Sequence, residues 1–288
     1  MEEEYVLRYT ESGGLTIAYQ VWGSSKDTLV YVPGMISHLE AGLEDSEYLS
    51  WIRELSKSFR LIIFDKRGQG LSDRDSSAPN LEERMDDISA IVAAENLDRF
   101  FLFGLSEGAA ISLVYAATHT TKVKSVAVFG GTAKFTRVDD YKFVPEYEVM
   151  VENMLSSWGT GKSGHYFCPQ KMPEKKAFFA KLERMVCNPK TLQGILELLS
   201  KIDVRPTLPD INVPVLVLHS RDDATISKLN GRYLADNIPG AKYIEYPIGG
   251  HLPWYEERKN IVKDLTIFFS KTGNNIHSAD RNLATILF

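Results

Sequence analysis

Short apolar runs alternate with segments of helical periodicity along most of this chain. The first two runs, 5–9 and 15–21, alternate apolar and polar residues around a Ser-Gly-Gly turn at 12–14, which predicts an antiparallel hairpin. Later runs are mostly apolar, as buried strands are, and lie at 29–32, 60–64, 99–103, 125–129 and 213–218; a further strand pattern lies at 241–246. Helical spacing occupies 47–58, 81–94 and 109–118 between them. This order predicts an α/β fold with an eight-stranded, mostly parallel sheet flanked by helices, and a ligand site at the carboxyl ends of the strands.

The alternation stops between the sixth and seventh expected strands. Residues 133–206 carry three helical segments, 144–156, 174–186 and 191–201, and are rich in aromatic residues. We expect a helical cap here, inserted after the sixth strand into a core formed by 1–132 and 207–270. Most of its aromatic side chains would attach the cap to the core, and two or three would line an apolar pocket that excludes water and receives an acyl or alcohol group.

The C-terminal region changes character after one more amphipathic helix at 254–269. Residues 271–281 are polar and predict a linker, whereas 283–288 are apolar and strand-prone. A strand edge without a partner is unusual, so this tail could pair with the sheet of a second copy in a homodimer.

Composition narrows the class of protein. The 288 residues are 44% apolar with a net charge of −5, which fits a large single α/β domain and argues against nucleic acid as the main partner. No signal peptide or membrane-spanning run is present in the sequence, so we expect a cytoplasmic protein without a membrane partner. Two isolated cysteines, Cys168 and Cys187, make no metal site, and we expect reduced thiols and no cofactor or metal.

The segment Gly104-Leu105-Ser106-Glu107-Gly108 joins an expected strand to an expected helix. A G-x-S-x-G sequence in that context forms a sharp turn that presents its serine above the sheet as a nucleophile. A serine hydroxyl needs a base to remove its proton. We therefore take Ser106 as the candidate nucleophile.

An acid and a histidine follow, each in a loop after an expected strand. Asp222 and Asp223 come after the strand at 213–218, and His251 follows the strand at 241–246. Ser, Asp, His is the chain order of one class of serine hydrolase. We expect His251 to be the base and Asp223 its partner, with Asp222 as the alternative acid.

Acyl transfer also needs N–H donors aimed at the developing oxyanion. The expected donors are the backbone N–H groups of Glu107 and of Met35, which lies in the Pro-Gly-Met loop after the strand at 29–32. The segment 65–72 holds charged residues around a glycine turn, and we expect it to stabilise a loop. His38, near the same loop, could line the pocket, but we expect it to be solvated.

With these residues identified, the chain resembles the α/β-hydrolase superfamily over residues 5–270. The motifs are PGM at 33–35, DKRGQGLSD at 65–73, GLSEG at 104–108, RDDATI at 221–226 and GGH at 249–251. The segments at 17–23, 32–40, 64–73 and 81–88 are similar to the N-terminal hydrolase module of bacterial proteins that continue into a class III adenylate/guanylate cyclase. The tail at 281–288 is similar to the first strand of such a cyclase. The resemblance implies a cyclase domain downstream in a longer protein. Ser220 departs from the glycine that many hydrolases carry before the acid loop.

These features predict a serine carboxylesterase that hydrolyses small to medium apolar esters through Ser106, His251 and Asp223. The partner would be a small-molecule ester. The alternative, favoured by a fused cyclase, is a ligand-sensing module that regulates a signalling domain with weak or no turnover.

Overall fold

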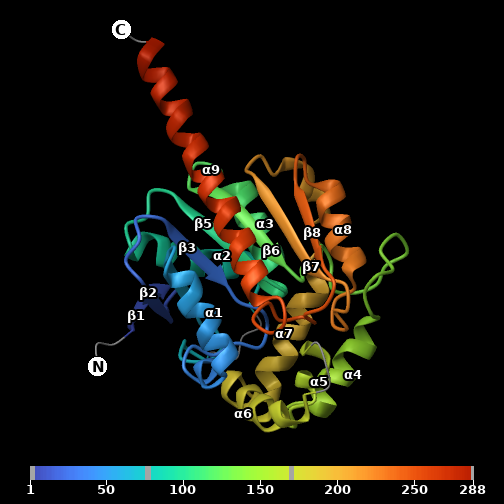
Figure 1. Ribbon diagram of the computed structural model, residues 1–288. Coiled ribbons are helices and arrows are strands. Elements are labelled where there is room, and N and C mark those ends of the chain that lie inside the picture. The colour runs from blue at the N-terminus through green and yellow to red at the C-terminus, as the bar shows by residue number, and fades with distance from the viewer. Residues whose placement is uncertain (1–3, 75–78, 169–171, 287–288) are drawn as a thin grey trace.

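An eight-stranded sheet forms the centre of the computed structural model, which describes residues 4–74, 79–168 and 172–286. Its strands are β1 (Tyr5–Ser12), β2 (Leu15–Trp22), β3 (Thr28–Val32), β4 (Arg60–Phe64), β5 (Phe100–Leu105), β6 (Val123–Phe129), β7 (Val215–Ser220) and β8 (Lys242–Tyr246). They lie in the order β1-β2-β4-β3-β5-β6-β7-β8 (Figure 1). The pairs β1–β2 and β2–β4 are antiparallel, and every later pair is parallel. The expected hairpin and mostly parallel sheet are therefore confirmed.

Helices cover both faces of the sheet. Helices α1 (Ser46–Ser56) and α9 (Arg258–Ile286) lie over one face in Figure 1, and α2 (Leu81–Ala94), α3 (Glu107–Thr118) and α8 (Lys228–Asn237) lie over the other. Strands β3, β5 and β7 are buried along their whole length. Burial on both faces is the reason that their sequences are continuously apolar instead of alternating.

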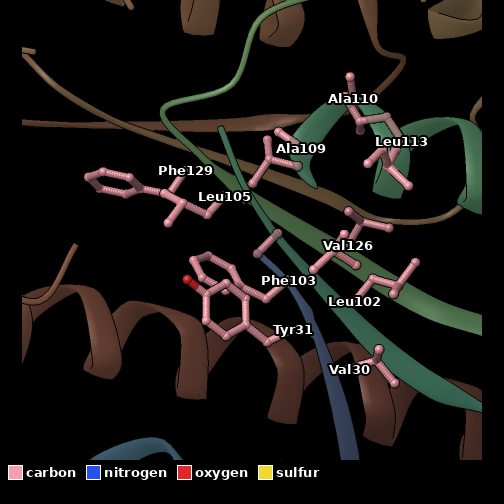
Figure 2. Packing of buried hydrophobic residues seen from close by; sticks show 14 of the residues in the cluster. Val30, Tyr31, Leu102, Phe103, Leu105, Ala109, Ala110, Leu113, Val126 and Phe129 are labelled. Carbon is pink, nitrogen blue, oxygen red and sulfur yellow. The ribbon is translucent and has the colours of Figure 1, made fainter. Parts of the chain in front are cut away.

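The core packs in two layers around β3, β5 and β6 (Figure 2). Tyr31 and Phe103 lie together on one side of these strands, with ring centroids 5.2 Å apart. Ala109 and Leu113 of α3 lie on the other side. All four residues are at most 1% exposed, and full burial of one large apolar side chain stabilises a fold by about 1.5–3 kcal/mol. This packing holds β5 and α3 in place on either side of the turn that carries Ser106.

Helix α2 begins as its sequence predicts. The Asn80 side chain accepts a hydrogen bond from the Glu83 N–H at 2.8 Å, and the Glu83 carboxylate accepts one from the Asn80 N–H at 2.8 Å. These reciprocal bonds form a capping box, which satisfies donors that a helix N-terminus leaves free. The helix starts at Leu81 as a result.

The chain between β6 and β7 is helical. It contains α4 (Tyr147–Ser157), α5 (Ser163–Phe167), α6 (Lys176–Val186) and α7 (Pro189–Lys201), with short 3₁₀ helices at Pro173–Lys175 and Arg205–Asp210. Helices α4 to α7 gather beside one end of the sheet (Figure 1). Cys168 and Cys187, in this region, are free and buried.

The expectations for the C-terminus were wrong. Where the sequence predicts a polar linker at 271–281 and a strand-prone tail at 283–288, α9 continues to Ile286, and residues 287–288 lie outside the described residues. Thr272 attaches the helix to β6, because its Oγ1 lies 2.7 Å from Ser125 Oγ. No proline follows Pro253, so nothing in the sequence forces the helix to end. Among the described residues no helix is long and apolar enough to cross a membrane.

Candidate active site

Ser106 lies at the apex of a strained turn between β5 and α3. Its φ of 54° and ψ of −115° place it, with Asn96, among the described non-glycine residues that have a positive φ. Such a conformation is costly for a residue with a side chain and recurs at functional sites. The Ser106 N–H donates to the Phe129 carbonyl of β6 at 3.0 Å, which ties the turn to the neighbouring strand.

The two flanking glycines are required by close backbone contacts. A Cβ at Gly104 would lie 2.4 Å from the Gly108 carbonyl oxygen, and a Cβ at Gly108 would lie 2.1 Å from the Val32 carbonyl oxygen. Both distances are far below van der Waals contact. The glycines therefore allow α3 to begin directly against β3, which is the role predicted for them in the turn.

The structure brings Asp223 to His251. Oδ2 of Asp223 lies 2.7 Å from Nδ1 of His251, and the side chains of both residues are at most 3% exposed. Asp222 instead accepts a hydrogen bond from the Gly250 N–H at 3.0 Å. Of the two candidate acids, Asp223 makes the contact that orients an imidazole. The departure at Ser220 does not disturb this contact.

A second imidazole contacts the same carboxylate, and sequence reasoning missed it. Nε2 of His219 lies 2.8 Å from the Ile226 carbonyl oxygen and 3.4 Å from Asp223 Oδ2. Burial alone would raise the pKa of Asp223, but His251 and His219 outweigh it and hold the pKa below its usual value. The N–H groups of Thr225 and Ile226 also donate to Oδ1 of Asp223, at 2.8 and 2.9 Å. The carboxylate is therefore ionised and fixed from several sides.

The two residues predicted to supply oxyanion donors border the same cavity as Ser106. Neither the Met35 N–H nor the Glu107 N–H has an acceptor within the part of the chain that the structure describes. Glu107 is the first residue of α3, where backbone N–H groups have no partner inside the helix. The loop that holds Met35 approaches the serine closely, since a Cβ on Gly34 would lie 3.2 Å from Ser106 Cβ.

Lys66 connects the two loops that carry these donors. Its ammonium group donates to the carbonyl oxygens of Pro33 and Gly34 at 3.0 and 2.8 Å and to Glu107 Oε2 at 2.7 Å. Lys66 and Glu107 are each 1% exposed. In a trans peptide the carbonyl and the following N–H point in opposite directions. By holding the Gly34 carbonyl, Lys66 therefore sets the direction of the Met35 N–H.

Glu107 is held by two cations beneath the turn. Besides Lys66, Arg84 Nε lies 3.6 Å from Glu107 Oε1. Burial raises the pKa of Glu107, but Lys66 and Arg84 outweigh it and hold the pKa below its usual value. The Glu107 side chain is therefore an ionised structural group, and only its backbone is available to a substrate.

The segment 65–72 forms a hydrogen-bonded loop, as expected. Asp65 accepts from the Leu71 N–H at 2.8 Å and the Leu39 N–H at 3.1 Å.

The expectation that His38 is solvated was wrong, because the residue is 4% exposed. Its Nδ1 accepts hydrogen bonds from the Glu40 and Ala41 N–H groups at 3.2 and 3.3 Å. These local contacts follow from the turn after β3, and no periodicity in the sequence indicates them.

Ser106 and His251 line one cavity of about 250 Å³, together with Met35 and Glu107. Its remaining walls are mostly apolar and come largely from the helical region; they include Phe135, Val144, Met150, Met154, Trp158, Phe167, Leu196 and Leu199. The ring of Phe167 packs 5.4 Å from that of His251, and the Phe167 carbonyl accepts from the His251 N–H at 2.9 Å. No group of three or more His, Cys, Asp or Glu side chains that could hold a metal occurs in the described residues.

Comparison with known proteins places this geometry in a family. Residues 23–258 match the sequence model of the family described as serine aminopeptidase, S33. The AB hydrolase superfamily protein YisY of Bacillus subtilis is 27% identical over 73% of this chain and 81% of its own length. The pimeloyl-[acyl-carrier protein] methyl ester esterase of Vibrio atlanticus is 24% identical over 89% of this chain and 99% of its own length.

A solved structure shows the same fold. The esterase EaEST from Exiguobacterium antarcticum superposes with a TM-score of 0.79 at 22% identity, over 93% of this chain and all of that one. These comparisons give no support to the narrower resemblance to a cyclase-fused module. The chain is a hydrolase of the α/β-hydrolase superfamily and belongs to the family described as serine aminopeptidase, S33.

Proposed function

We propose that this protein is a serine carboxylesterase that forms an acyl-enzyme on Ser106. The observation that carries the proposal is the shared cavity: Ser106, an imidazole backed by Asp223 and two unpaired backbone N–H groups all border it. A nucleophile, an oriented base and oxyanion donors around one space are the components that acyl transfer requires.

The reaction would follow from these positions. His251 takes the proton of Ser106 as its hydroxyl attacks the ester carbonyl, and the Met35 and Glu107 N–H groups stabilise the tetrahedral oxyanion. His251 then gives the proton to the leaving alcohol. Water, activated by the same imidazole, releases the acid and restores the serine. Asp223 holds the His251 tautomer and stabilises the imidazolium.

The shape of the cavity favours apolar esters. Helices α4 to α7 would act as a cap that supplies apolar walls and excludes water, which strengthens electrostatic interactions inside the site. A cavity of about 250 Å³ suits a short to medium acyl chain.

Ester bonds fit this cavity better than the peptides suggested by the description of the family. An aminopeptidase needs an anionic group for the substrate's amine, and two carboxylates border the cavity, Glu107 and Glu183. Glu107 is paired with Lys66. Glu183 accepts from the Gly161 and Ser163 N–H groups and from the Ser163 hydroxyl. Neither is free to bind an amine, whereas two of the similar proteins are described as esterases.

Hydrolysis of p-nitrophenyl esters from acetate to dodecanoate tests the proposal, with wild type and Ser106→Ala in parallel. We expect turnover with an optimum at short to medium chains and its loss in the variant. Equal rates in the two proteins across the series would refute a Ser106 esterase.

A further inference from the structure

A second, smaller cavity adjoins the proposed active site. It has a volume of about 40 Å³ and shares Gly34, Ile36 and Leu105 with the larger cavity, so it lies beside the turn that presents Ser106. Its other walls come from the loop after β3, from α1, from α6 and from the segment after His251. The two cavities therefore adjoin at the loop after β3 and at the end of β5.

Unpaired hydrogen-bonding groups border this small cavity. Ser37 Oγ is buried and has no partner among the described residues. The hydroxyls of Tyr31 and Tyr48 also form no hydrogen bond within the part of the chain that the structure covers. Buried polar groups in folded proteins nearly always have partners, so a cluster without them calls for an occupant that supplies acceptors.

His38 adds another donor to the same wall. Since Nδ1 accepts two backbone N–H bonds, the ring proton is on Nε2. Burial lowers the pKa of His38, and Arg74 lowers it further against the opposing effect of Glu44, so the ring stays neutral. Nε2–H has no acceptor among the described residues.

The charges near the small cavity are already compensated. Asp45 borders it, but its Oδ1 accepts from Lys175 Nζ at 2.8 Å and its Oδ2 accepts from the Tyr255 hydroxyl at 2.6 Å. Among the described residues that border this cavity, no ionic charge is left over for a substrate. The cavity is therefore rich in neutral donors, whereas the larger one is mostly apolar.

We propose that the small cavity is a subsite for a short, uncharged, oxygen-bearing group of the ester, while the hydrocarbon part occupies the larger cavity. This inference rests on the proposed esterase function and specifies its substrate class. A volume of 40 Å³ holds about three water-sized groups, enough for a methoxy or hydroxymethyl substituent. An ether, keto or hydroxyl oxygen there would accept from Tyr48, Ser37 or His38.

Isosteric ester pairs test the proposal, because each pair exchanges one CH₂ for oxygen. One pair, 2-methoxyethyl hexanoate and butyl hexanoate, probes the alcohol side. The other pair, hexyl methoxyacetate and hexyl butyrate, probes the acyl side. Each kcat/KM is divided by the ester's hydroxide-catalysed rate constant, which removes the intrinsic activation by oxygen. We expect the oxygen-bearing ester to be favoured about tenfold in one of the pairs, the value of one well-formed hydrogen bond.

Two variants assign the preference to this cavity. Tyr48→Phe and Ser37→Ala should each reduce it by about threefold or more while leaving the all-carbon esters unchanged. Tyr9→Phe, on a side chain exposed on β1, is the matched control and should leave the preference intact. Two results would overturn the subsite and mean that the cavity holds water only. One is equal normalised kcat/KM values within both ester pairs, and the other is a preference for the oxygen-bearing ester that both variants retain. If the all-carbon esters were still hydrolysed in a Ser106-dependent way, the proposed esterase function would be retained and only the subsite rejected. If none of the four esters were hydrolysed, both the esterase function and the subsite would be rejected.

Discussion

Replacing Lys66 by methionine should damage the reaction without touching a group that contacts the substrate. The change removes the donor of the Gly34 carbonyl, and the Gly34–Met35 peptide loses the contact that sets its plane. It also leaves the Glu107 carboxylate buried with only Arg84, at 3.6 Å. The first effect concerns catalysis and the second concerns stability.

Each effect has an expected magnitude. Removing one partner of a buried ion pair costs about 3–5 kcal/mol of folding free energy. Losing one oxyanion donor lowers kcat by about 10²–10³. A Met35 N–H that is misdirected part of the time should lower kcat by about 10–100-fold, with KM unchanged because the donor acts on the transition state.

A double variant separates the two effects. In Lys66→Met with Glu107→Gln a neutral amide replaces the carboxylate that has lost Lys66, while Arg84 keeps its hydrogen bond to the Arg67 carbonyl and the attraction of Asp87. Urea denaturation should therefore show part of the stability restored. The kcat should remain low, since the Gly34 carbonyl still lacks its donor. Lys124→Met, which breaks the partly exposed pair with Asp27, is the control and should leave kcat unaltered. Recovery of kcat in the double variant, or an unchanged kcat in Lys66→Met, would refute the orienting role.

Four further substitutions have expected outcomes. Asp223→Asn should lower kcat by about 10⁴ through loss of the correct His251 tautomer, and Asp222→Asn by less than about tenfold, as steady-state kinetics would show. Burial raises the pKa of Asp65 to about 7. Between pH 4 and pH 7 the folded protein therefore keeps a proton on Asp65 that the unfolded chain has lost. The free energy of unfolding should fall by up to about 4 kcal/mol as pH rises from 4 to 7. Urea titrations should show this slope reduced in Asp65→Asn. Gly108→Ala should lose about 3 kcal/mol of stability, because its Cβ would lie 2.1 Å from the Val32 carbonyl oxygen; an unchanged urea midpoint would argue against that contact.

Local signals in the sequence predicted most of the sheet and the turn at Ser106. The strands could be predicted because burial on both faces of the sheet leaves continuous apolar runs. The start of α2 could be predicted because Asn80 and Glu83 form a local capping box. Helix α8 was not predicted. Its segment contains Asn230 and Gly231, which are weak helix formers, and Gly231 is needed because a Cβ there would lie 2.5 Å from His219 Nδ1.

The parts of the site that sequence reasoning missed depend on contacts between distant segments. Lys66 belongs to a loop that was correctly expected to be structural, but its three acceptors come from the loop after β3 and from α3. His219 lies on a buried strand and contacts Asp223 only because the chain turns back after β7. Neither contact leaves a periodicity or a spacing in the sequence.

Covalent labelling of the serine tests the central claim most directly. Diethyl p-nitrophenyl phosphate should phosphorylate one residue, Ser106, as read by mass spectrometry of the intact protein and of its peptides. The adduct should form in step with the loss of esterase activity, should be absent in Ser106→Ala and should form far more slowly in His251→Ala. Esterase activity lost while Ser106 remains unmodified, or retained while Ser106 is fully labelled, would contradict the account.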